Sequence, residues 1–142
     1  MGTTARQRAL ERRRPKVITR DEIILRLWPV PTACGDARRA IRQFCHARGV
    51  GHLADDAELL TSEVVSNAIR HATTLITVVG AKHDDVLVVS VVGDNSGHVD
   101  LTPQRVDDMA ENGRGLVVLD SVADEWGCSP HYDGTTVWFR LS

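Results

Sequence analysis

Residues 60–72 read LTSEVVSNAIRHA, a stretch with the apolar spacing of a helix. At a hundred degrees per residue its apolar side chains fill one contiguous half of a helix, the half that would pack on a sheet. Glu63 and Asn67 are four residues apart, so they lie along one edge of this apolar half, with His71 one turn further on. Polar groups at the border of a buried face can point into a cleft while the helix stays packed.

Helical and strand patterns alternate on either side of this stretch. The Lys82 to Asp85 link is the size of a hairpin turn, and Tyr132-Asp133-Gly134 reads as a second turn, so each joins antiparallel strands. This order predicts an α/β (α+β) fold, a two-layer sandwich of a mixed, mainly antiparallel sheet with helices on one face. The expected elements are a strand at 23–28, helices at 36–48 and from 55 or 56 to 71, strands at 75–81 and 86–92, a short helix at 105–111, a helix at 116–123, and strands at 126–129 and 135–141.

The composition indicates one soluble domain. The chain has 142 residues, 42% of them hydrophobic and 25% charged, values that exclude collagen-like, coiled-coil and wholly disordered proteins. We expect a cytoplasmic protein, because no apolar run has the ~18 to 20 residues of a membrane span and the first residues lack a signal peptide's apolar stretch. The three cysteines are too scattered for a disulfide framework or a C-x-x-C metal site.

Charge divides the chain into two parts. Residues 1–20 hold seven of the 17 Lys and Arg but one of the 19 Asp and Glu, so a basic segment precedes an acidic body. We interpret 1–20 as a disordered tail and 21–142 as a single domain. A basic tail leaves nucleic-acid binding open as an alternative. It is disfavoured because the tail has no aromatic side chain to stack on a base and phosphate would repel the acidic body.

Three stretches could carry chemistry. The Glu63 carboxylate could act as a general base and the Asn67 amide oxygen is a ligand suited to Mg²⁺, although such a pair is often only a solvated helix flank. Asp94 follows a strand, where its carboxylate could accept a hydrogen bond from an exocyclic amine such as that of adenine. Gly97 would let a flat ring approach the backbone. The alternative for D-N-S-G is a polar turn.

The third stretch is N-G-R-G-L at residues 112–116, which precedes an amphipathic helix. Two glycines free backbone N–H groups, and the positive end of a helix favours phosphate oxygens. The stretch lacks the G-K-[ST] of a P-loop and the third glycine of a Rossmann fingerprint. A single G-x-G can also be part of a loop that binds nothing.

Taken in this order, the three stretches resemble the GHKL (histidine kinase/Hsp90-like) ATPase superfamily. Residues 60–72 look like its N-box, 94–97 like its D-x-G adenine box, 113–116 like its second glycine box and 135–141 like its closing strand. The small size, the helix before the N-box and the G-R-G-L sequence are most similar to the stand-alone anti-sigma-factor serine kinase branch. The resemblance implies a Bergerat-type ATP-binding fold.

The resemblance also implies roles for individual residues. Glu63 would polarise the attacking hydroxyl or water, Asn67 would hold Mg²⁺ on the phosphates, and Asp94 would read the adenine amino group. Residues 100–112 would form the ATP lid. Arg70 could meet a phosphate or lie on the helix surface. The remaining cofactor-binding positions are Gly97 beside the base and Gly113, Arg114, Gly115 and Leu116 at the phosphates.

The function that the resemblance implies is that of an ATP- and Mg²⁺-binding regulatory protein. It would be a serine/threonine protein kinase and anti-sigma factor that phosphorylates a serine of a small antagonist protein, with a sigma factor as a further partner and a homodimer as its assembly. The main alternative is an ATP-dependent protein-interaction module without phosphoryl transfer. A two-component histidine kinase is disfavoured because no helix carries a phosphoacceptor histidine. A gyrase-like or chaperone-like engine is excluded for want of a transducer domain.

Overall fold

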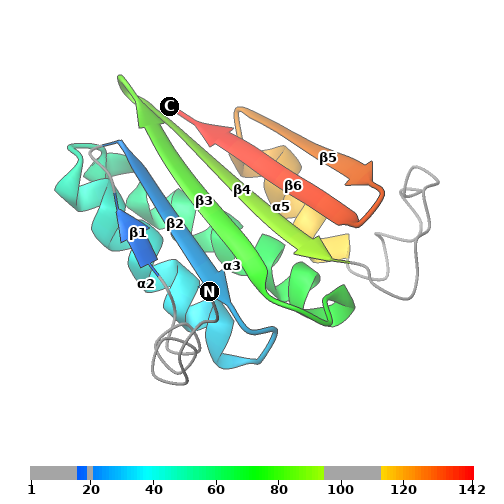
Figure 1. Cartoon of the computed structure of the whole chain (residues 1–142). Helices are drawn as coiled ribbons and strands as arrows, with labels where there is room; N and C mark the ends of the chain where they lie inside the picture. Colours follow the sequence, from blue (N-terminus) through cyan, green and yellow to red (C-terminus); the bar gives the residue numbers. More distant parts are fainter. Residues whose placement is uncertain (1–15, 19–20, 95–112) are drawn as a thin grey trace, which may run out of the picture.

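The computed structural model describes residues 16–18, 21–94 and 113–142, in which one sheet is covered by helices on one face (Figure 1). The sheet has six strands in the order β1-β2-β3-β4-β6-β5. The strands are β1 Lys16–Ile18, β2 Glu22–Leu27, β3 Ile76–His83, β4 Val86–Asp94, β5 Glu125–His131 and β6 Gly134–Leu141. The helices are α2 Thr32–Ala47, the 3-10 turn η1 Gly51–Leu53, α3 Ala54–His71 and α5 Gly113–Val122.

This architecture confirms the two-layer α/β fold class. All five strand pairings in the described ranges are antiparallel, so the parallel pair that a mixed sheet would need is not among them. The last strand in the sequence, β6, lies between β4 and β5. The end of β4 therefore has neighbours from two distant parts of the chain, with Val92 paired to Thr77 on one side and to Thr136 on the other.

The strand sequences determine which face of the sheet is covered. In β4, Leu87, Val89 and Val91 are buried, and the residues between them are half-buried. The same alternation runs through β2 and, from Thr136 onward, through β6, as expected where one face of a sheet packs on helices and the other does not. The core lies between the sheet and helices α2 and α3, and Phe139 is its largest fully buried side chain.

The two long helices pack against each other as well as on the sheet. Their apolar stripes supply the buried residues Ala37, Ile41 and Phe44 from α2 and Leu60 and Val65 from α3. At the polar edge of this contact the Cys34 thiol of α2 lies 3.0 Å from the Ser66 hydroxyl of α3. The α3 helix is thus held by α2, by the sheet and by α5.

Several boundaries differ from those that the sequence predicts. Helix α2 begins at Thr32, ahead of the predicted residue 36, and α3 begins at Ala54 after the turn η1. Residues Lys16–Ile18, which fall in the predicted tail, form β1 by pairing with β2. The β3–β4 hairpin turns on Asp84 and Asp85 alone, with Asp84 at φ +53°. The short helix predicted at 105–111 lies outside the described residues.

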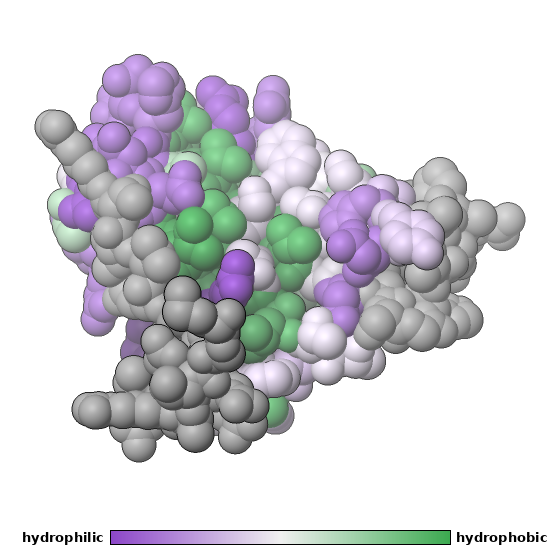
Figure 2. Space-filling view, viewed as in Figure 1, coloured by the Kyte–Doolittle hydropathy of each residue, from purple (hydrophilic) through white to green (hydrophobic). Residues whose placement is uncertain are grey.

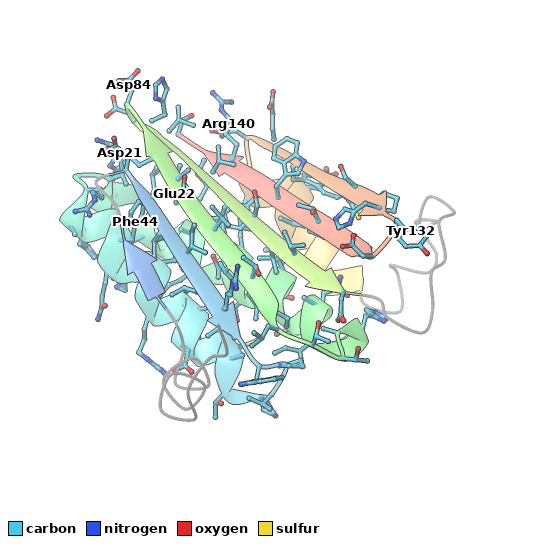
Figure 3. The ribbon with its side chains drawn as sticks, viewed as in Figure 1. Asp21, Glu22, Phe44, Asp84, Tyr132 and Arg140 are labelled. Carbon is cyan, nitrogen blue, oxygen red and sulfur yellow. The ribbon has the colours of Figure 1, made fainter. Side chains whose placement is uncertain are left out.

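Asp84 marks one end of the sheet and Tyr132, at the β5–β6 turn, marks the other (Figure 3). Asp94 pairs with Gly134, so it belongs to the Tyr132 end. None of the helices in the described part of the chain is long and apolar enough to cross a bilayer.

Candidate functional site

Helix α3 carries the first predicted site residues, Glu63 and Asn67. Both side chains are half-buried, whereas Val64 and Val65 of the same helix are buried. They therefore sit at the border of the packed face, where the helical period puts them. Arg70, in the last turn of α3, is exposed. Its surroundings agree with the helix-surface interpretation and leave it accessible to a phosphate.

Asp94, at the end of β4, is held against the segment that follows α3. Its Oδ1 accepts hydrogen bonds from the backbone N–H groups of Thr73 at 2.9 Å and Thr74 at 3.1 Å. Its Oδ2 accepts from the hydroxyls of the same residues, at 3.3 Å from Thr73 and 2.6 Å from Thr74. The carboxylate predicted to read adenine thus lies directly beyond the end of the helix that carries Glu63 and Asn67.

Two glycines lie where these segments meet, and one of them, Gly134, is required there. A side chain on Gly93 would lie 3.6 Å from the Cβ of Ala68 and 3.9 Å from that of Ala72, which shows how near β4 runs to the last turns of α3. A side chain on Gly134 would overlap the carbonyl oxygen of Gly93. Helix α3 and strands β4 and β6 therefore come close together near Asp94. At Gly134 there is no room for a side chain.

Helix α5 contributes its N-terminus. It begins at Gly113, so the G-R-G-L sequence forms its first turn instead of a loop before it. The first four N–H groups of a helix have no partner within it, and they favour an anion. Because α5 packs against α3, the glycine-containing turn belongs to the same side of the sheet as Glu63 and Asn67.

Some predicted positions remain untested by the geometry. Gly97 and the predicted lid at residues 100–112 lie outside the described residues. For Gly113, Arg114, Gly115 and Leu116 the structure describes the helical backbone. The structure therefore ties Asp94 to the end of α3, which carries Glu63 and Asn67, and packs α5 on the same helix.

The chemistry of the donor set fits a magnesium ion that is bound largely through phosphates. In the part of the chain that is described, no group of three or more His, Cys, Asp or Glu side chains could hold a metal by itself. Mg²⁺ commonly takes one or two protein oxygens and completes its shell with nucleotide phosphates and water. The amide oxygen of Asn67 suits that arrangement, and a dedicated protein cage is not needed.

A polar cluster on the β5–β6 hairpin lies at the same end of the sheet. His131 Nδ1 is 2.9 Å from Asp133 Oδ1, and its Nε2 is 2.9 Å from Thr136 Oγ1. The hydrogen bond from His131 holds the pKa of the Asp133 carboxyl below its usual value. The cluster fixes the turn that precedes Gly134 and so supports the β6 residues opposite Asp94.

Sequence reasoning missed Thr73 and Thr74. Their positions directly after the helix gave one available signal, because hydroxyl residues next to a chain reversal often satisfy a nearby carboxylate or backbone group. Their partner, however, is 20 or 21 residues away in the sequence. The pairing of β3 with β4 is what brings them together.

Comparison with known proteins is consistent with this geometry. A family model described as the histidine kinase-like ATPase domain matches residues 27–141, which include every described element from α2 to β6. A search of curated proteins found no match. Since the family model covers far more than half of the sequence, the chain belongs to the histidine kinase-like ATPase family.

Proposed function

We propose that this protein is an ATP-dependent serine/threonine protein kinase that also acts as an anti-sigma factor, in a circuit where it phosphorylates a serine of a small antagonist protein. Family membership supports ATP use and a regulatory role. The observation that carries the proposal is that Asp94 is anchored to the segment directly after α3, the helix that carries Glu63 and Asn67, and that α5 packs against the same helix.

Each group has a defined task in this proposal. Asp94 accepts the exocyclic amine of adenine, and the N–H groups in the first turn of α5 bind phosphate oxygens. Glu63 polarises the serine hydroxyl of the antagonist and takes up its proton. Asn67 would hold Mg²⁺, which would supply charge neutralisation on the phosphates. In phosphoryl transfer positioning and electrostatics account for most of the rate, so few protein groups are required.

Titration calorimetry with ATP, in the presence and absence of Mg²⁺, tests the nucleotide site. We expect Asp94→Asn and Asn67→Ala each to weaken binding about tenfold or more, because a hydrogen bond to a charged group contributes roughly 1.5–3 kcal/mol. Asp56→Asn is the matched control, since Asp56 is an exposed carboxylate at the other end of α3. A folded wild-type protein that does not bind ATP would overturn the proposal.

Transfer of labelled γ-phosphate to serine in purified candidate antagonists tests catalysis. Glu63→Gln should abolish transfer and leave ATP affinity within about twofold, because the proton acceptor is lost while the nucleotide contacts remain. ATP-dependent antagonist binding without any transfer by the wild type would favour the alternative, an interaction module that uses ATP only to shape its surface.

The proposed homodimer has a candidate surface on the open face of the sheet, defined here as the face opposite the helices. Apolar side chains gather there over the central strands (Figure 2). Ile24, Val79 and Trp138 lie in one row across β2, β3 and β6, and each is half-buried. Among the described residues no helix covers this face (Figure 1). Antiparallel sheets can pack face to face in sandwiches.

Charge placement on the open face favours a second copy as the occupant. Glu22 on β2 and Arg140 on β6 lie at the same level of the sheet, since Glu22 pairs with Ala81, Ala81 with Val88 and Val88 with Arg140. A two-fold axis parallel to the strands would set Glu22 of each copy opposite Arg140 of the other. An isologous interface needs such self-complementarity.

Sedimentation velocity tests this arrangement. We expect the wild type to be a dimer and the charge reversal Arg140→Glu to be largely monomeric. The double variant Glu22→Arg with Arg140→Glu should restore the dimer, because the two charges across the interface are exchanged. A wild type that is monomeric at high concentration, or a double variant no better than the single one, would contradict the proposed interface.

A further inference from the structure

Asp94 is bound by two kinds of donor, and they divide between its two oxygens. Oδ1 accepts from two backbone N–H groups, those of Thr73 and Thr74, at 2.9 and 3.1 Å. Oδ2 accepts from the two side-chain hydroxyls, at 3.3 Å from Thr73 and 2.6 Å from Thr74. A carboxylate has about four lone-pair sites, so it can accept from several donors at once.

The two oxygens differ in how easily a ligand could reach them. The backbone N–H groups cannot turn away unless the chain after α3 moves, so they anchor Oδ1. The hydroxyls can leave by a single side-chain rotation, and both threonines are exposed. A base amine that approaches Asp94 would therefore replace a hydroxyl on Oδ2 and leave Oδ1 undisturbed.

The distances indicate which hydroxyl is replaced. At 2.6 Å the Thr74 hydroxyl makes a short hydrogen bond of the charge-assisted kind, whereas at 3.3 Å the Thr73 hydroxyl is beyond the usual range for O–H···O contacts. The Thr73 hydroxyl is the weaker donor. It occupies the place on Oδ2 that an exocyclic amine would take.

We infer that Thr74 is a positioning residue for base recognition and that Thr73 holds the place of the base amine until a nucleotide binds. Thr74 fixes the plane of the Asp94 carboxylate, so that Oδ2 faces the base. This inference rests on the proposed function, because it takes Asp94 as the group that reads an aminopurine.

Two nucleotides separate this role from a purely structural one. ATP carries the exocyclic amine, and purine riboside 5′-triphosphate lacks it but keeps the ring, sugar and phosphates. Thr74→Val keeps the branched shape and removes the hydroxyl, and Thr74→Ser restores the hydroxyl. We expect Thr74→Val to weaken ATP binding about tenfold and to change the affinity for the analogue less than twofold, with Thr74→Ser near the wild type for both.

Thr73→Val completes the test. Removing the place-holding hydroxyl should leave ATP affinity equal to or greater than that of the wild type, since a competing donor has gone. Thermal unfolding of each variant verifies its fold, and Thr74→Ala provides a second variant without the hydroxyl. Affinities come from titration calorimetry with Mg²⁺ present.

The outcomes distinguish this inference from the proposed function. If the wild type binds ATP but Thr74→Val leaves both affinities unchanged, or weakens both nucleotides equally, the positioning role is wrong while the nucleotide site stands. If Thr73→Val weakens ATP binding as much as Thr74→Val does, the assignment of the two hydroxyls is wrong. If the folded wild type binds neither nucleotide, the proposed function fails.

Discussion

Replacing Gly134 by alanine should break the junction between β4 and β6 at Asp94. Gly134 pairs with Asp94, and an added Cβ would overlap the carbonyl oxygen of Gly93 and lie 3.0 Å from the Cα of Asp94. Both obstacles are backbone atoms, so no side-chain rotation can relieve the overlap. The two strands must separate at this end of the sheet.

The expected loss of stability is the free-energy cost of separating β4 and β6 at this end. Overpacking in a well-packed site costs typically about 1–3 kcal/mol. Losing one or two strand hydrogen bonds next to Gly134 adds roughly 1 kcal/mol each. We therefore expect the free energy of unfolding to fall by about 2–5 kcal/mol and the midpoint of thermal unfolding to fall by about 10 °C. ATP affinity should fall too, because Asp94 is carried by the displaced strand.

Urea unfolding followed by circular dichroism measures this loss, and Gly93→Ala is the matched control. At Gly93 the added Cβ meets the Cβ atoms of Ala68 and Ala72 at 3.6 and 3.9 Å, which are ordinary van der Waals distances. The control should stay within about 1 kcal/mol of the wild type. A Gly134→Ala protein as stable as the control would refute the steric reasoning.

Three further predictions concern stability elsewhere. Thr61 is fully buried, and its hydroxyl has no hydrogen-bond partner among the described residues, so Thr61→Val should raise the free energy of unfolding by about 1 kcal/mol in urea titrations. A free energy of unfolding below that of the wild type would mean that the Thr61 hydroxyl has a hydrogen-bond partner. Gly49 has φ +78° with open space around it, so Gly49→Ala should cost about 1–2 kcal/mol from backbone strain alone. An unchanged midpoint of urea unfolding in Gly49→Ala would contradict this estimate of the backbone strain. Burial raises the pKa of the Cys45 thiol from 9.0 to about 11, so its neutral form stabilises the fold fully below pH 9 and this contribution is lost as the pH rises toward 11. In Cys45→Ala the free energy of unfolding should therefore fall less between pH 9 and pH 11 than in the wild type. An equal fall in the two proteins would contradict this prediction.

The sequence pattern alone could predict the elements whose buried residues recur with a fixed period. Alternating residues of β4 predict a strand with one buried face, and Leu87, Val89 and Val91 are indeed buried. The helical period likewise predicts that Glu63 and Asn67 lie at the edge of the packed face of α3, where both are half-buried.

The features that sequence reasoning missed depend on contacts between distant residues. Strand β1 has three residues and exists by pairing with β2, so no local period marks it. The early start of α2 has no side-chain cap at Pro31 that a reader could recognise. The Thr73 and Thr74 contacts of Asp94 arise because β3 and β4 form a hairpin, which places the two ends of that hairpin side by side.

The position of β6 has a consequence for synthesis on the ribosome. Translation delivers α3, β3 and β4 first, and β5 next, but β5 pairs with β6 and β4 also needs β6 on its second side. Until residues 134–141 leave the exit tunnel, the nascent chain exposes an unpaired edge of β4, and unpaired edges invite association with other chains. The pairing of β4 with β6 beside Asp94 is therefore completed late in synthesis, and a nascent chain that stalls before Gly134 would leave this edge of β4 unpaired.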